Sequence, residues 1–96
     1  MKIELKKFGT TLTSRQSGKE AYLAFLPILD ALGNKEKIEI DFKEIKTFSP
    51  SWGDEFLTML AKKYKERVIL TNTDNLSVKI TIKLLEEITG YKFKIK

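Results

Sequence analysis

Two serine hydroxyls and two carboxylates are concentrated in one short run near the middle of the chain, residues 49–55 (SPSWGDE). A serine at the start of a helix can accept a hydrogen bond from a free backbone amide. A serine there can also be phosphorylated, because the free amides and the positive end of the helix dipole stabilise an anion. The run therefore predicts a helix start whose serines serve as caps, as phosphate acceptors, or as both.

Proline and acidic residues in this run support a capping role. Pro50 suits the first helical position, where its missing N–H removes no hydrogen bond, and this frame makes Ser49 the N-cap. In the alternative frame Ser51 is the N-cap, and Asp54, three residues later, is its reciprocal partner. In both frames Asp54 and Glu55 lie in or near the first turn, where negative charge is favourable. The sequence leaves both frames open.

The same run is a candidate docking and regulatory site for a protein partner. A phosphate on Ser51 would be repelled by the neighbouring carboxylates, which suits a modification that breaks a contact with a partner. Trp52 is the only tryptophan, and it either folds back onto the core or stays on the surface as an anchor for the partner. The residues predicted to form this site are Ser49, Ser51, Trp52, Asp54 and Glu55.

Two further polar residues are expected to support the site. Asp41 follows an apolar run that reads as a strand, and its carboxylate is expected to bond the turn that follows. Arg15 is expected to form an ion pair with Asp41 or Asp54, or else to bind an anion. The short segment around Arg15 contains one glycine and no lysine in register, so it is not a nucleotide-binding loop.

Composition excludes several kinds of catalytic and metal site. The chain contains no cysteine and no histidine, which excludes disulfides, zinc ribbons and both Ser-His-Asp and Cys-His catalysis. No second acid, base or set of metal ligands accompanies Asp41 in the sequence. We therefore expect a protein that is not an enzyme, with no catalytic residue, no metal and no cofactor.

The basic charge balance raises a different function, binding to nucleic acid. The net charge is +5 and the isoelectric point is about 9.4. The lysines are scattered along the chain, however, and arginine, which dominates base readout, occurs only at Arg15 and Arg67. A solvated lysine surface is the simpler interpretation, so a small nucleic-acid-binding protein is kept only as the alternative function.

Length and hydropathy indicate one domain over residues 1–96. The apolar stretches are short and interrupted by charged residues, so no segment is expected to span a membrane. The first residues, MKIELKKF, alternate apolar and charged side chains and do not resemble a signal peptide. We expect a cytoplasmic protein, and the sequence does not indicate its oligomeric state.

Hydrophobic periodicity predicts strands and helices in alternation. Strands are expected at 2–8, 10–12, 37–42 and 67–72, and an exposed edge strand at 91–96. A first helix is expected to begin at one of two competing capping boxes, Thr13 with Gln16 or Ser17 with Glu20. It is expected to end at Gly33 and to be kinked or split by Pro27, and a second helix is expected at about 50–65.

The segment 75–89 fits two structures. A strand, and a hairpin with 67–72, are favoured by apolar residues that alternate with other residues: Leu76, Val78, Ile80, Ile82 and Leu84. Every fourth residue from Leu76 is also apolar, and the segment ends at a glycine, as a helix would. The predicted fold class is therefore α/β in the order β-β-α-β-α-β-α(-β), with a small mixed sheet of four to five strands and about three helices.

Three short motifs in this order resemble the STAS domain (sulfate transporter and anti-sigma factor antagonist), and more closely a bacterial STAS-like family. Ser14-Arg15 stands near the start of the first helix, Asp41-Phe42 ends the central strand, and the run 51–55 opens the second helix. The likeness covers about residues 1 to 90. It implies a helix rather than a strand at 75–89.

The resemblance to anti-sigma factor antagonists implies a regulatory switch. In those proteins a serine at the start of this helix is phosphorylated by a histidine-kinase-like ATPase, and the phosphate controls docking of that partner. The matching position here is Ser51. The chain differs in one respect, because Pro50 precedes this serine where the antagonists usually carry aspartate.

Overall fold

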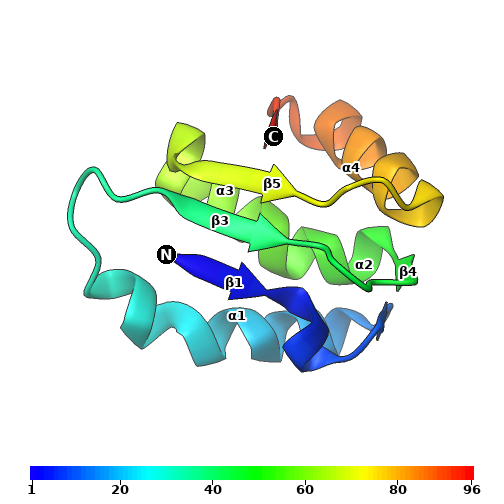
Figure 1. The fold of residues 1–96 in the computed structure, drawn as a ribbon, viewed down its shortest axis with the longest axis horizontal. Coiled ribbons are helices and arrows are strands. Elements are labelled where there is room, and N and C mark those ends of the chain that lie inside the picture. The colour runs from blue at the N-terminus through cyan, green and yellow to red at the C-terminus, as the bar shows by residue number, and fades with distance from the viewer.

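Four short strands form the central sheet, and all four run parallel. The structure is a computed structural model that describes residues 1–96. The strands are β1 (Lys2–Glu4), β3 (Ile38–Asp41), β5 (Val68–Thr71) and β6 (Lys94–Ile95), in the spatial order β1-β3-β5-β6 (Figure 1). Because a tight turn cannot join parallel strands, the chain must cross over between them, and it does so through helices.

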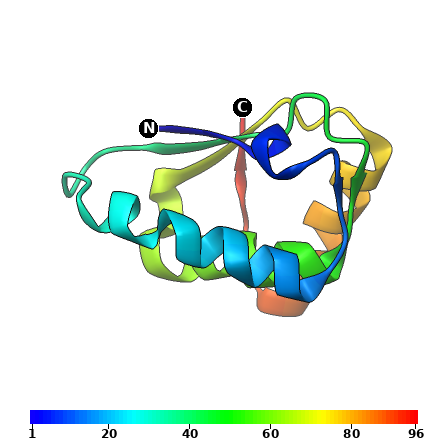
Figure 2. The same cartoon turned by 90° about the horizontal axis from the view of Figure 1, so that it is seen from below.

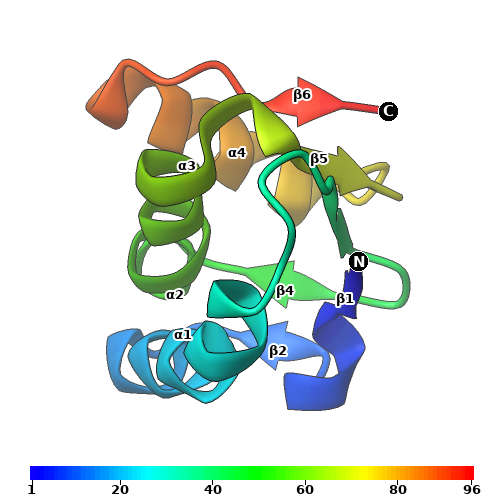
Figure 3. The ribbon, with the colours of Figure 1, turned by 90° about the vertical axis from the view of Figure 1, so that its left-hand side faces the viewer.

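Three helical segments cover one face of this sheet. They are α1 (Arg15–Asp30); a continuous run of α2 (Pro50–Gly53), the π-helical turn η2 (Asp54–Thr58) and α3 (Met59–Tyr64); and α4 (Leu76–Thr89). Figures 2 and 3 show these helices gathered on the same side of the strands. No helix is both long enough and apolar enough to span a membrane.

Burial along the strands agrees with this one-sided arrangement. Ile38 and Ile40 of β3 are fully buried, and Glu39 between them is only half-buried. In β5, Val68 and Leu70 are buried in the same way. The side chains that alternate into the core come from both strands and meet the helices. The predicted α/β class is therefore confirmed.

The prediction of a mixed sheet is wrong, because the second strand does not pair with the first. After β1 the chain forms a short 3-10 helix, η1 (Leu5–Phe8), whose Leu5 side chain is completely buried. This turn carries the chain away from the sheet. The next strand, β2 (Thr11–Leu12), pairs in parallel with β4 (Thr47–Phe48) in a separate two-stranded sheet.

Helix α1 begins and continues differently from the prediction. Its N-cap is Ser14, whose hydroxyl accepts a hydrogen bond from the Ser17 amide at 2.9 Å, so neither predicted capping box is used. The helix also runs unbroken past Pro27 to Asp30. Pro27 lies on the exposed side, where the carbonyl left without a partner can bond to water, so the proline does not split the helix.

The segment 75–89 is a helix, and the alternative hairpin does not form. Asn75 caps α4 by accepting a hydrogen bond from the Val78 amide at 3.2 Å, and Gly90 follows the helix with φ of 77°. The tertiary arrangement explains this choice, because β5 pairs in parallel with β6 and a parallel pair requires a crossover. The predicted edge strand at the end of the chain is confirmed by β6.

Candidate functional site

The predicted helix start exists, and Ser49 is its cap. The Ser49 hydroxyl accepts a hydrogen bond from the Trp52 amide at 3.4 Å and donates one to the Thr13 carbonyl at 2.8 Å. The Ser49 amide also donates to the Leu12 carbonyl at 2.9 Å, so the β2–β4 pair holds this corner in place. The frame with Pro50 at the first helical position is therefore the correct one.

Ser51 differs from Ser49 in having a free hydroxyl. The residue is half-buried and lies in the first turn of α2, and no hydrogen bond within the chain engages its hydroxyl, whereas that of Ser49 is engaged twice. Asp54 and Glu55, three and four residues later, lie on the same side of the helical segment because of this spacing. An unengaged hydroxyl thus stands next to two carboxylates.

Arg15 binds both of these carboxylates across the gap between two helices. One guanidinium nitrogen donates to the Asp54 carboxylate at 3.1 Å and to the Glu55 carboxylate at 2.8 Å. The hydrogen bonds to Asp54 and Glu55 raise the pKa of Arg15. The predicted pair with Asp54 is confirmed, and no contact links Arg15 to Asp41. The cluster is exposed to solvent, so its contribution to stability is small.

Trp52 belongs to the core, so the prediction that its indole is presented to a partner is wrong. Its side chain is only 1 % exposed. Its ring centroid lies 4.9 Å from that of Phe56 and 6.0 Å from those of Phe8 and Phe48. The large apolar area of the indole is better removed from water, and its place in the third helical position turns it toward these rings. The other predicted fate, burial in the core, is confirmed.

Gly18 brings the starts of α1 and α2 together, and the sequence interpretation did not identify it. A Cβ atom placed on Gly18 would lie 2.6 Å from the backbone carbonyl oxygen of Trp52. Only glycine permits this approach without a shift of the backbone. The available signal was a lone glycine within a helical pattern, which often marks close packing. The contact places Arg15 where it can reach Asp54 and Glu55.

Asp41 supports the loops at the end of the sheet, as predicted. Its carboxylate accepts hydrogen bonds from the Lys43 amide at 2.9 Å and from the Asn72 side chain at 2.7 Å, and the Lys2 ammonium lies 3.5 Å away. Burial by itself would raise the pKa of Asp41, but the hydrogen bonds from Asn72 and Lys43, with the charge of Lys2, lower it overall. Asp41 therefore stays ionised while only 2 % exposed.

A polar hollow of about 460 Å³ lies next to Asp41, at the carboxyl ends of β1, β3 and β5. Ligands often bind at this edge of an open α/β sheet. The Asp41 carboxylate, however, is already occupied by its own hydrogen bonds, and no group of three or more acidic side chains is arranged to hold a metal ion. We assign no ligand to this hollow. Besides Asp41 its walls include Lys2, Glu4, Glu44, Asn72 and Asp74.

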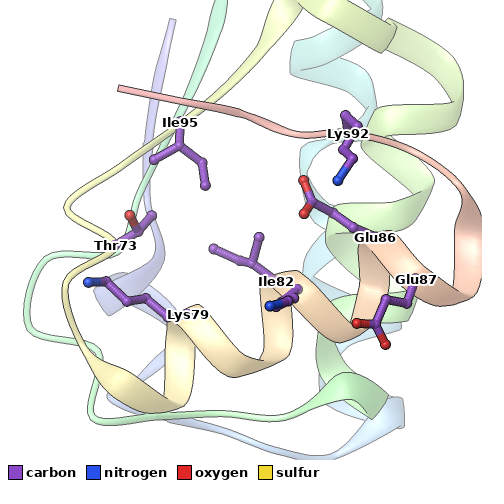
Figure 4. Close-up of a pocket in the computed structure, with 8 residues that line it drawn as sticks. Thr73, Lys79, Ile82, Glu86, Glu87, Lys92 and Ile95 are labelled. Carbon is purple, nitrogen blue, oxygen red and sulfur yellow. The ribbon is translucent and has the colours of Figure 1, made fainter.

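A second hollow, of about 430 Å³, lies between α4 and β6 (Figure 4). Ile82 and Ile95 form its apolar wall. Charged side chains of α4 and of the segment between α4 and β6 surround it. No signal in the sequence pointed to this hollow, because it forms only when β6 lies beside β5. The charged residues are Lys79, Lys83, Glu86, Glu87 and Lys92.

Comparison with known proteins places most of the chain in a family. Residues 17–87 match the model of a family described as "STAS-like domain of unknown function (DUF4325)". The match includes Asp41 and all of the residues from Ser49 to Glu55. Neither a search of curated proteins nor a search of solved structures found a match to the chain.

Proposed function

The chain belongs to this STAS-like family, and on that premise we propose that it is a cytoplasmic, non-enzymatic regulatory module that docks a protein partner. The proposed docking surface lies at the adjoining starts of α1 and α2. One observation carries the proposal, namely the free hydroxyl of Ser51 beside the exposed ionic cluster of the two helices. The surface consists of Arg15, Ser49, Ser51, Asp54 and Glu55.

The proposed docking surface is held in a fixed conformation by the residues beneath it. Such a surface favours recognition, because a preorganised site loses less conformational entropy when it binds a partner. The Ser49 hydroxyl bonds to the Trp52 amide of its own helix and to the Thr13 carbonyl between β2 and α1, and the buried Trp52 anchors the first helical turn to the aromatic core. Asp54 and Glu55 belong to the π-helical turn η2. Turns of this kind are rare and are frequently found at functional sites.

Phosphorylation of Ser51 would change the charge of this surface. In the unmodified protein the positive charge of Arg15 is shared by two carboxylates. A phosphate adds a charge of about −2 and competes for the guanidinium, because arginine forms strong paired hydrogen bonds with phosphate. Asp54 and Glu55 would then repel the phosphate or release Arg15. The surface would change in both charge and shape, as a switch requires.

Ser51 phosphorylation is tested by mass measurement. A histidine-kinase-like ATPase is the partner class that the resemblance implies, so the protein is incubated with ATP and such an ATPase, and its intact mass is recorded. We expect the addition of one phosphate to the wild type and none to Ser51→Ala. Ser17→Ala, which alters an exposed serine in the first turn of α1, is the control and should still be modified. Phosphorylation of Ser51→Ala would refute this step.

Docking is tested with the same ATPase by calorimetry. We expect Ser51→Ala to bind as the wild type does, and Ser51→Glu and Arg15→Glu to bind at least tenfold more weakly, because both add negative charge to the surface. Lys19→Glu, an exposed change further along α1, is the control for charge alone and should bind normally. Equal binding of all these variants would refute the proposed docking surface.

A further inference from the structure

The net positive charge of the chain comes entirely from its last third. Residues 1–61 contain nine basic and nine acidic side chains, whereas residues 62–96 contain nine basic and four acidic ones. The second group therefore accounts for the whole net charge of +5. A charge asymmetry of this kind indicates a surface that meets an acidic partner.

Most of the lysines in this last third are not neutralised within the fold. Among all the lysines of the chain, ion pairs are formed only by Lys2, Lys6, Lys7 and Lys63. Six lysines near the end of the chain are exposed and form no ion pair: Lys65, Lys79, Lys83, Lys92, Lys94 and Lys96.

The fold gathers these lysines around β6, although they are scattered along the sequence. Lys65, Lys92 and Lys94 line a hollow of about 300 Å³ between the end of α3 and the segment that leads into β6. Lys92 also lines the hollow of about 430 Å³ between α4 and β6, together with Lys79 and Lys83. In Figure 4 Lys92 and Lys79 stand at opposite rims of this larger hollow. The two hollows share Lys92, so the lysines form one continuous surface.

Carboxylates are present on this surface, but the lysines outnumber them. The acidic residues that line the two hollows are Glu66, Glu86 and Glu87. Glu86 is engaged within the chain, because its carboxylate accepts a hydrogen bond from the Phe93 amide at 2.8 Å. That bond also holds the backbone of the segment that separates the hollows. Positive charge therefore prevails around β6, and such a surface attracts anions.

The smaller hollow adds aromatic side chains to the lysines. Tyr91 and Phe93 line it and are both half-buried, and Ala61 and Val68 form its apolar floor. Proteins that bind single-stranded nucleic acid without sequence preference combine a positively charged groove with aromatic rings on which the bases stack. An acidic peptide would use the lysines alone. The combination of lysines with aromatic rings therefore favours nucleic acid.

We propose that this β6 surface, made by the six unpaired lysines with Tyr91 and Phe93, binds single-stranded nucleic acid. The lysines contact phosphates, and Tyr91 contacts a base. The binding is independent of base sequence, because a lysine is a point charge and does not make the paired base contacts of arginine. Figure 3 shows β6 and α1 at opposite ends of the molecule. The β6 surface is thus separate from the docking surface at the starts of α1 and α2, and it does not depend on the function proposed there.

Titration of the isotope-labelled full chain, followed by NMR, tests the site and its location. The ligands are oligothymidine and oligouridine of about 20 nucleotides at roughly 50 mM salt, where the electrostatic attraction is strong. We expect dissociation constants of about 10–100 µM, and a plot of log affinity against log salt with a slope of about −3 to −4. The amide signals of residues 65 and 91–96 should move, and those of Arg15 and Ser51 should not.

Two double variants with the same net charge test whether the position of the lysines matters. Lys92→Glu with Lys94→Glu should bind oligothymidine at least tenfold more weakly than the wild type, with a shallower salt dependence. Lys19→Glu with Lys35→Glu is the matched control, because both lysines are exposed and unpaired but lie far from β6 in the sequence. It should lose less than threefold. Circular dichroism confirms that both variants fold.

Variants of Tyr91 test the contact with a base. Stacking of a base on an aromatic ring is worth about 1–3 kcal/mol, so Tyr91→Leu should bind oligothymidine at least fivefold more weakly. Tyr91→Phe keeps the ring and should bind as the wild type does. Oligoglutamate of the same length has the negative charges without the bases, and the wild type should bind it at least tenfold more weakly than oligothymidine.

Three results would overturn the proposal. The first is a wild type whose amide signals do not move with either oligonucleotide at low salt. The second is an equal loss of affinity in the two double variants, which would show that only the net charge of the chain matters. The third is oligoglutamate that binds as tightly as oligothymidine, with Tyr91→Leu unchanged, which would assign the surface to an acidic protein instead.

Discussion

Replacement of Gly18 by alanine tests the close contact on which the site is built. The added Cβ would lie 2.6, 3.0 and 3.2 Å from the carbonyl oxygen, Cα and carbonyl carbon of Trp52. All three atoms belong to the backbone of the first turn of α2, so no side chain can rotate to make room. The two helix starts must therefore move apart, which disturbs both the packing of Trp52 and the ion pairs of Arg15.

Two opposing effects set the size of the change in the free energy of unfolding. Alanine is favoured over glycine within a helix by about 1 kcal/mol. Overpacking of a tightly packed core typically costs about 1–3 kcal/mol, and a backbone contact belongs to the upper part of that range. We expect Gly18→Ala to be less stable than the wild type by about 1–2 kcal/mol. For a domain of this size, each kcal/mol lowers the melting temperature by about 4–8 °C.

Thermal and urea unfolding followed by circular dichroism measure this change. Gly33→Ala is the control, because a Cβ on Gly33 would meet no atom within 4 Å, and it should be neutral or stabilising by up to about 1 kcal/mol. Ala24→Gly, at an exposed position of α1, measures helix propensity alone and should lose about 1 kcal/mol. If Gly18→Ala proves as stable as the wild type or more stable, the contact between the two helix starts is not as described.

Three further predictions concern single residues. Trp52→Ala should lose about 3–5 kcal/mol in urea unfolding, because the indole fills the centre of the aromatic core, and the fluorescence of wild-type Trp52 should shift to longer wavelength on unfolding. The pKa of Asp41 in the folded state lies below the unfolded value of about 3.9. The ionised carboxylate therefore stabilises the fold at pH values above about 3.9, and this stabilisation is lost as the pH falls through the folded pKa. Unfolding titrations below about pH 4 should therefore show a weaker pH dependence for Asp41→Asn than for the wild type. Asn75→Ala should lose about 1 kcal/mol, because it removes the cap of α4, and Asp74→Ala, an exposed neighbour, is its control in the same thermal assay.

Local signals were sufficient to predict the second helical segment and the two central strands, although they left two frames open for the helix start. A proline after a serine predicts a capped helix from a few neighbouring residues, and Ser49 and Pro50 occupy the positions of one of the two predicted frames. The runs that became β3 and β5 are short and rich in isoleucine, valine and leucine, as buried parallel strands are. The helical segment and the two strands each depend on residues of one short segment, so the local sequence contains most of the information needed to predict them.

Features that depend on distant segments were decided by the tertiary structure. Residues 76–88 satisfy both a two-residue and a four-residue period, and the parallel β5–β6 pair, which requires a crossover, favours the helix. The pairing of β2 with β4 and the burial of Trp52 likewise depend on elements tens of residues away.

For the site, the sequence alone determined which chemical groups are present: serine hydroxyls, carboxylates and one arginine at a helix start, with no histidine or cysteine. The tertiary structure decided which of them are free. In the folded chain the Ser49 hydroxyl caps α2, and the Ser51 hydroxyl forms no hydrogen bond. Trp52 is buried in the core, and Arg15 binds the carboxylates of Asp54 and Glu55. The physical reason is that the packing of α1 against α2 through Gly18 sets which of these side chains are exposed and which partners they bind. No local sequence pattern specifies that contact.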